Sequence, residues 1–416
     1  MPCCFIRSVF FALGLFSALL VQADEQAALG LKGFATLGMA RSNSDQAEFV
    51  RDLSQSRGIG KHWSGEIDSL LGVQANLRLG ERSEAVVQGI SRYRTDGSFA
   101  PELSWAFLRY DFSPNIQVRV GRLAPEFYLL ADSRLVGYAN VAVRPSVDFY
   151  GPLVFAYADG ADLSGSFPLG EGLLRSKVYF GRSSEKTGFR DPITWDISGS
   201  QLYGAYLDYQ QGAWQFRLTQ FRAHFATELP LSALAQMAIQ STPALAPLQA
   251  LGPIDLSALM PELSTVGTTS RFDSLGVAYD HGPLQVQAML GRIRHESETY
   301  EDSKAGFILA SYRLGEWTPY VGYSQVKSSP VTLRTQPAGP LGGVLQQFAQ
   351  RLTTGTHLDQ HTTTIGLRWD FASRFAFKLQ LDSIRGQQDS VFLFRGPDVQ
   401  WDGQMKVISA TLDFVF

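Results

Sequence analysis

The chain is poor in cysteine, in charged residues and in long apolar runs, and each shortage excludes a class of protein. Its two cysteines, Cys3 and Cys4, both lie close to the start of the 416 residues. Charged residues make up 18%, below the usual quarter, and the formal net charge is −3 at pH 7. Neither value is typical of a nucleic-acid-binding protein, so no nucleic acid is expected as a partner. After residue 23 no segment has 18 consecutive apolar residues, which excludes a membrane-spanning helix there.

The beginning of the chain has the parts of a secretory signal peptide. Arg7 precedes the apolar run "SVFFALGLFSALLV", and "VQA" (21–23) is a small-x-small cleavage site. A membrane anchor is the alternative, but the run is shorter than the roughly 20 residues that a spanning helix needs. We therefore expect a cleaved signal peptide at 1–23 and a mature chain at 24–416. Both cysteines would leave with the signal, so no disulfide is expected to stabilise the mature chain.

Motifs for common enzyme chemistry are also missing. The sequence has no Gly-x-Ser-x-Gly elbow, no phosphate-binding glycine loop and no cysteine pair in the predicted mature chain. "HLDQH" (357–361) has two histidines four residues apart, but it lacks the glutamate of a helical zinc site and lies where a loop meets a strand. We interpret it as a wet loop, and we expect no metal, no cofactor and no enzyme. A hydrolase with Ser, His and Asx residues far apart in sequence stays a formal alternative.

Alternation of apolar and polar residues dominates what remains. The chain ends in "QMKVISATLDFVF", where Ile408, Ala410, Leu412, Phe414 and Phe416 occupy every second position. Successive side chains of a strand point to opposite faces, so this segment has one apolar and one mostly polar face. The same pattern recurs in about sixteen segments, each near the length that a tilted strand needs to cross a membrane. These ranges are 30–41, 66–79, 83–93, 102–112, 115–122, 153–166, 172–182, 200–210, 213–225, 271–280, 283–295, 303–314, 316–327, 361–371, 374–386 and 404–416.

The connections between these segments alternate between short and long. Seven are short, such as "SPN" and "HG", and eight are long, among them 123–152 and 226–270. Aromatic residues such as Trp214, Trp317 and Trp369 flank the short turns, as in the girdle of a membrane barrel. A soluble β-sandwich is the alternative, but it has no reason to keep its long loops at one end. The pattern predicts an all-β, transmembrane, antiparallel up-and-down barrel of about 16 strands, with both termini at the short-turn end.

The polar faces of several strands carry cations that parity directs into the lumen. For most of them, solvation of a wet wall is a sufficient explanation. The long connection 123–152 is too apolar to hang in water, so we expect it to fold into the lumen and narrow it. Acids on this loop would then face a basic wall and give a transverse field, unless Arg134 and Arg144 pair with those acids locally. The inward cations are Arg78, Arg92, Arg109, Arg119, Lys177, Arg217, Arg368 and Lys378. The predicted constriction consists of Arg92, Arg109, Arg119 and Arg122 with Glu126, Asp132 and Asp148.

The chain resembles the Gram-negative porins, the sixteen-stranded trimeric channels of the bacterial outer membrane. The last strand ending in Phe416 is similar to the assembly signal of outer-membrane barrels, and "DSLLGVQ" (68–74) is similar to the second porin strand. "SWAFLRYDFSPNIQVRVGR" (104–122) is similar to the fourth and fifth strands, where Gly-Arg precedes the long third loop. The loop departs from many general porins, since only "APEF" (124–127) stands where they carry an acidic core. The 226–270 loop is also unusually long.

The resemblance implies a homotrimer in the Gram-negative outer membrane, in contact with outer-membrane lipid. Small residues expected to point outward, Gly33, Ala35 and Ala410, would let barrel walls approach each other. The main functional hypothesis is passive diffusion of small hydrophilic solutes and ions. A substrate-specific uptake channel is the alternative, followed by an outer-membrane enzyme or adhesion barrel. The Ala- and Leu-rich segment 231–263 is interpreted as a helical loop, packed on the barrel rim or covering the pore mouth.

Overall fold

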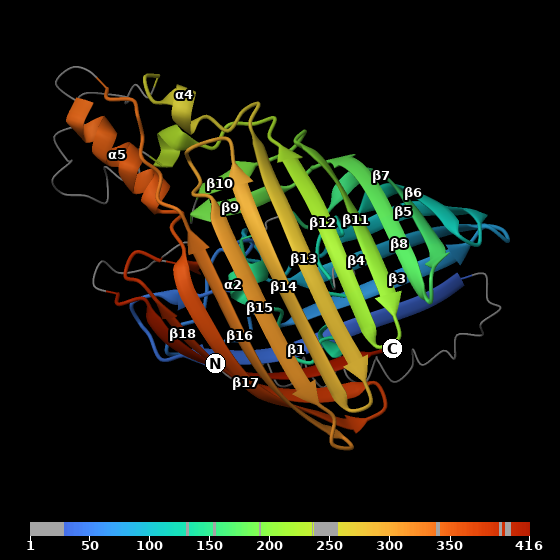
Figure 1. Cartoon of the computed structure of the whole chain (residues 1–416). Coiled ribbons are helices and arrows are strands. Elements are labelled where there is room, and N and C mark those ends of the chain that lie inside the picture. Colours follow the sequence, from blue (N-terminus) through green and yellow to red (C-terminus); the bar gives the residue numbers. More distant parts are fainter. Residues whose placement is uncertain are drawn as a thin grey trace.

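Sixteen strands close into a single antiparallel barrel in the part of the chain that the structure describes (Figure 1). The structure is a computed structural model, and it describes residues 29–129, 133–152, 155–190, 193–234, 236, 257–337, 342–390, 393–395 and 401–416. The predicted signal peptide lies outside these residues. The predicted fold class is confirmed, and each of the sixteen predicted ranges overlaps one barrel strand.

The barrel strands follow the chain in order, and the last one pairs with the first. They are β1 (Leu29–Ser42), β3 (Leu70–Arg78), β4 (Ser83–Arg92), β5 (Glu102–Ser113), β6 (Ile116–Leu123), β7 (Ala158–Leu169), β8 (Gly172–Arg182), β11 (Gln201–Gln211), β12 (Trp214–His224), β13 (Thr269–His281), β14 (Leu284–His295), β15 (Ser303–Tyr312), β16 (Trp317–Ser328), β17 (Asp359–Ala372), β18 (Phe375–Gly386) and β20 (Gln404–Val415). Two small pairs that the sequence did not predict lie in the long connections. They are β2 (Glu48–Phe49) with β19 (Phe394–Arg395), and β9 (Lys186–Arg190) with β10 (Ile193–Asp196).

The alternation read from the sequence reappears as alternation in exposure. In β20, Ile408 is 46% exposed, whereas its neighbours Val407 and Ser409 are fully buried. Leucine, isoleucine, valine and aromatic side chains on the other strands are exposed in the same way, which gives the barrel an apolar outer surface. Within the described residues, no helix is long and apolar enough to span a membrane.

Glycine forms the tight turns at one end of the barrel. Gly170, Gly212, Gly282 and Gly315 have φ between 56° and 63°. This left-handed conformation costs other L-residues steric strain, and it matches the twist of a short hairpin. The short hairpins thus define one end of the barrel, and the beginning of β1 and the end of β20 lie at that end.

Closure of the barrel depends on the last residue. Phe416 and Gly33 exchange two backbone hydrogen bonds, each 2.9 Å long. The Phe416 ring covers Gly33 so closely that an added Cβ would lie 2.1 Å from it. Gly33 is therefore small because the chain's own terminal ring occupies that space. Ala35 is only 5% exposed within a single chain. Neither residue therefore gives the free outer surface that the expectation of contacting barrel walls assumed.

Two helices of the long connections, α4 (Met260–Leu263) and α5 (Gly342–Thr354), lie at the other end of the barrel, beyond the strand ends (Figure 1). They belong to two different connections. α5 was not predicted, and it buries Phe348 and Leu352 against apolar residues of neighbouring loops. Most of the 231–263 segment lies outside the described residues, so α4 is the clearest described piece of the predicted helical loop.

Candidate functional site

The connection between β6 and β7 (residues 124–157, hereafter the crossing loop) reaches both sides of the barrel interior. It includes η1 (Gly137–Ala139) and α2 (Val147–Tyr150). Near its start, Glu126 contacts side chains of β6, β8 and β11. Eighteen residues later, Arg144 contacts β18 and β20, which lie on the other side of the closed strand order. The loop therefore connects the two sides of the barrel through polar contacts at its beginning and its middle.

Glu126 forms the first attachment point. Its carboxylate accepts hydrogen bonds from Arg119 (2.6 Å), Lys177 (2.5 Å) and the Tyr206 hydroxyl (3.2 Å). Burial favours a higher pKa for Glu126, but the two cations outweigh it and lower the pKa to about 2. Asp162 also pairs with Arg119. Glu126 thus stays ionised and lies against Arg119, the arginine that the sequence analysis placed opposite the loop acids.

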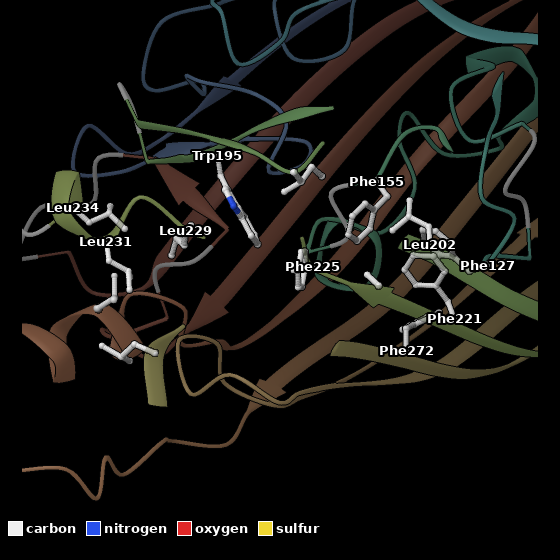
Figure 2. Packing of buried hydrophobic residues seen from close by; sticks show 14 of the residues in the cluster. Phe127, Phe155, Trp195, Leu202, Phe221, Phe225, Leu229, Leu231, Leu234 and Phe272 are labelled. Atoms are coloured by element: carbon white, nitrogen blue, oxygen red, sulfur yellow. The ribbon is translucent and has the colours of Figure 1, made fainter. Parts of the chain in front are cut away.

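An apolar cluster follows Glu126 and fills part of the interior. Phe127, Tyr128 and Leu129 are at most 5% exposed, and they pack with Phe221 and Phe272 on the inward faces of β12 and β13. Figure 2 shows these rings continuing through side chains of the long connections towards the rim. Phe155, Trp195, Phe225, Leu229, Leu231 and Leu234 extend the cluster. The barrel interior beside β12 and β13 is therefore an apolar core. The apolar composition of the crossing loop predicts that the loop is buried in this way.

Cations of β17 and β18 hold the middle of the loop through its backbone. Lys378 has no exposed side-chain surface, and it donates to the carbonyls of Gly137 (2.7 Å) and Ala142 (3.2 Å). It also pairs with Asp413 at 3.0 Å. Arg368 donates to the carbonyls of Tyr138 and Asn140 in the same manner. Alternation predicts only that both cations line a wet wall, because backbone acceptors such as these carbonyls leave no mark in a sequence.

Arg144 forms the most buried ion pairs of the loop. Its side chain is 1% exposed and pairs with Asp68 at 2.6 Å and with Asp382 at 2.9 Å. A further hydrogen bond joins it to the Ser409 hydroxyl. Among the described residues, Arg144 therefore pairs with acids outside its own loop, and not with Glu126 or Asp148 as the alternative left open by the sequence required. We call the inward faces of β1, β16, β17, β18 and β20 the anchored wall, since they hold the loop.

Asp148 does not face the arginines that the sequence analysis placed opposite it. Its carboxylate accepts hydrogen bonds from Ser324 (2.6 Å) and Gln360 (2.8 Å) on the anchored wall. Burial raises the pKa of Asp148, although these hydrogen bonds oppose the shift. The expectation failed because α2 turns this carboxylate towards β16 and β17. Asp132, the third predicted acid, lies outside the described residues.

Arg122 lies on the face opposite to the predicted one. The register pairs it with Ala106 and Asp159, whereas Arg119 pairs with Arg109 three residues earlier along β6. Residues an odd number apart on a strand point to opposite faces, so Arg122 points outward. Its guanidinium bonds to Asp159 at 2.8 Å and stacks on Tyr157. Arg122 is therefore not part of an inner basic wall.

Arg92 and Arg109 do point inward, but each has acidic partners. Arg92 is 8% exposed and pairs with Glu102 at 3.3 Å and Asp52 at 3.6 Å, near the long-loop end. Arg109 pairs with Glu84 at 3.0 Å and Asp111 at 3.4 Å, and 38% of its side chain stays exposed. Of the predicted basic residues, Arg109 is the one whose charge is most available to a solute in the lumen.

Arg109 belongs to a polar band on the inward faces of β3 to β7, which we call the open wall. Hydrogen bonds of 2.8–2.9 Å connect Ser104, Gln88, Gln74, Asn76 and Glu84 in a line along this wall. At the short-turn end the line meets a polar cavity of about 450 Å³. Arg82, Arg109, Asp111, Gln117, Ser164 and Ser166 are among its lining residues. The interior therefore has a wet side and a filled side.

Comparison by sequence alone places the chain in no group. No protein-family model matches it. No curated protein matches it either.

Comparison by structure finds outer-membrane channels. An anion-selective porin from Comamonas acidovorans aligns with a TM-score of 0.52 at 15% identity, over 93% of this chain and 99% of that one. OmpF of Salmonella typhi, in a complex with daunomycin, gives 0.55 at 11% identity, over 93% and 97%. The outer membrane channel DcaP of Acinetobacter baumannii gives 0.53 at 12% identity, over 93% and 97%. Identities this low show a shared fold, and the predicted resemblance is confirmed at that level: this chain has the fold of the sixteen-stranded porins.

Proposed function

We propose that this protein is an outer-membrane channel through which small hydrophilic solutes and ions diffuse along the open wall. The observation that carries the proposal is the contrast in exposure between inward cations. Arg109 on the open wall is 38% exposed, while Lys378 on the anchored wall is fully buried. A solute in the lumen would therefore meet hydrated polar groups on one side and the packed crossing loop on the other.

The narrowest point of this route is proposed to lie where Glu126 of the crossing loop meets Arg119 of the open wall. Arg119 keeps 15% of its side chain exposed, and Phe107 of β5 lies beneath its guanidinium. Because Glu126 and Asp162 neutralise Arg119, the field here is local and weaker than two separated charged walls would give. Arg109 therefore becomes the main candidate for setting ion selectivity.

A substrate-specific channel of the same architecture is the second candidate. The apolar core and the crossing loop reduce the space inside the barrel, which favours a narrow and selective route over a wide one. Saturable block of conductance by one class of solute would support this candidate. Block by no solute would leave plain diffusion as the better description.

Single-channel recording in a planar bilayer with a salt gradient tests both candidates. Stepwise conductance with a measurable reversal potential supports a channel. A purified, correctly folded barrel that inserts and stays silent would contradict it, and would favour an enzyme or adhesion barrel. The reversal potential gives the sign of ion selectivity.

Outer-membrane placement, assembly and processing belong to the same proposal. The protein is proposed to reach the outer membrane after cleavage behind Ala23, and to assemble there as a homotrimer. The exposed apolar outer surface supports membrane insertion. The likeness in fold to porins supports trimerisation by analogy only. The intact mass of the mature protein tests cleavage, and its mass in mild detergent tests assembly, where a monomer alone would contradict the trimer.

A further inference from the structure

The outer wall of the barrel has an apolar groove over β12 to β16, with a volume of about 1140 Å³. Its lining includes Leu218, Leu275, Leu290, Ile308 and Tyr323, all between 46% and 67% exposed. The register sets these side chains next to one another on adjacent strands. The groove is therefore a hollow in the lipid-facing surface.

Two small outward residues line the groove, and the Leu290 side chain leans over one of them, Gly306. Gly306 of β15 lies between Leu290 of β14 and Gln325 of β16 in the register. Ala288 pairs with Val277 and Ile308, so it adds a second position without a large side chain. A longer side chain at Ala288 would enter the groove. The space thus comes from the residues themselves, and it has the apolar character that suits an acyl chain.

Three cations border the groove towards the long-loop end. Arg292, Lys304 and Lys327 point outward on adjacent strands β14, β15 and β16, and each stands directly opposite the next in the register. Like charges directly opposite one another on neighbouring strands destabilise a sheet. Lys327 pairs with Asp359 at 3.0 Å. Within the described residues, Arg292 and Lys304 make neither an ion pair nor a side-chain hydrogen bond.

Asp273 of β13 stands opposite Arg292 in the register, but the next outward row towards the long-loop end is basic. Arg222, Arg271 and Arg294 pair with one another in the register of β12, β13 and β14. Their acidic partners are Asp273 and Glu296. With the three cations at the groove and Asp359, the partner of Lys327, the ion pairs and cations named here comprise six cations and three acids, an excess of three positive charges. Such a patch attracts an anion that lies outside the barrel.

We infer that this groove and its cationic border form a binding site for a lipid with phosphate groups on its headgroup. One acyl chain lies in the groove, and a phosphate lies between Arg292 and Lys304. Charge complementarity and the order of the two parts along the strands support this occupant, because a lipid carries its phosphate at the interface and its chain towards the membrane centre. The site is on the outer face, so it does not depend on conduction through the lumen.

Lipid binding to the purified full-length protein in detergent tests the inference. The probes are a disaccharide lipid with two phosphates, the same lipid without phosphate, and inorganic phosphate. Each cation near a phosphate surface contributes about fivefold in affinity, so Arg292→Gln with Lys304→Gln should weaken binding of the phosphorylated lipid about 25-fold. Binding of the phosphate-free lipid should not change. Ala288→Phe should weaken binding of both lipids, since it fills the groove.

A matched control removes the same charge elsewhere on the outer face. Arg41→Gln with Lys406→Gln changes two cations on β1 and β20, at least four strands away from β15 around the barrel. This variant should bind the phosphorylated lipid as the unchanged protein does.

Four outcomes decide the inference. An equal loss of affinity in both double variants would show that only the total charge matters, and would overturn the site. Equal affinity of the unchanged protein for both lipids would overturn it as well. Displacement of the lipid by millimolar inorganic phosphate would show a free-anion site instead. If the double variant fails to fold, Lys304→Gln alone is expected to show about a fivefold loss.

Discussion

Where the crossing loop meets the anchored wall, Lys378 of β18 and Arg144 of the loop have at most 1% of their side chains exposed, while Arg109 on the open wall keeps 38%. All three are cations inside one barrel, and each has an acidic partner close by. The difference is that packing between the crossing loop and the anchored wall buries the first two side chains, while the third stays in water. Burial turns a cation into a structural attachment, because an unpaired charge away from water is costly. Exposure leaves its field available to a passing ion.

Among the variants considered, loss of Arg144 should have the largest effect on the stability of the protein. Arg144→Ala leaves Asp68 and Asp382 buried without their cation. Removing one partner of a buried pair typically costs about 3–5 kcal/mol, and we expect a loss near 4 kcal/mol in the free energy of unfolding. Detachment of the loop should also raise single-channel conductance. Urea unfolding in detergent measures the first effect.

The outward Arg122→Ala variant is the control for that experiment, since its ion pair with Asp159 is partly exposed and should be worth at most about 1 kcal/mol. If Arg144→Ala and Arg122→Ala unfold at the same urea concentration, the anchored wall does not hold the loop through Arg144.

Variants of Lys378 separate the contribution of its ion pair from that of its loop contacts, because its acidic partner Asp413 can be replaced together with it. Lys378→Met leaves Asp413 buried and unpaired, and should cost about 3 kcal/mol. Adding Asp413→Leu removes the orphaned charge, so the double variant should recover at least half of that loss. The carbonyls of Gly137 and Ala142 would still lack the Lys378 donor, although Gly137 keeps the Asn140 N–H, and this loss prevents full recovery. A double variant no more stable than the single one would show that the loop contacts, and not the ion pair, dominate.

Glu185, in the connection between β8 and β9, gives a pH-dependent test of how the last residues of the crossing loop are held. Its carboxylate accepts hydrogen bonds from the backbone N–H groups of Ala156 and Tyr157. Burial raises the pKa of Glu185 to about 7, although these two hydrogen bonds oppose the shift. A raised acid pKa gives stability that is complete below the unfolded value of 4.5 and is lost as pH rises through 7.

The protein should therefore lose up to about 2 kcal/mol between pH 5 and pH 8 through this group. Glu185→Gln should remove that part of the slope. Unfolding curves of both proteins at pH 5, 6, 7 and 8 provide the measurement, and parallel pH profiles would contradict the assignment.

Arg109→Ala should have the smallest effect on stability and a clear effect on transport. Its ion pairs with Glu84 and Asp111 are partly exposed, so the free energy of unfolding should change by less than about 1 kcal/mol. Removing this positive charge should shift the reversal potential towards cations, by a permeability factor of up to about five, and raise conductance. Arg119→Ala should shift selectivity in the same direction, because it leaves Glu126 and Asp162 with Lys177 as their one remaining described cation. An unchanged reversal potential in both variants would exclude this route along the open wall.

The local alternation of apolar and polar residues was sufficient to predict the fold. Alternation in segments such as 404–416 requires strands with one apolar face, and glycines such as Gly212 and Gly282 close short turns, so strand number and order followed from the sequence. The same rule could have excluded Arg122 from the lumen, because it stands three residues after the inward-facing Arg119. The parity information was therefore present in the sequence.

Only the tertiary structure decided what the inward residues do. Arg144 meets Asp382 across 238 positions of sequence, and Lys378 meets the carbonyl of Gly137 across 241. Alternation is a property of neighbouring residues, so it fixes the face on which a side chain lies and carries nothing about what the loop brings to that face. The apolar composition of the crossing loop showed that it must be buried. Which wall it covers, and hence which cations remain in water, depends on packing among residues that the chain brings together only after the barrel has closed.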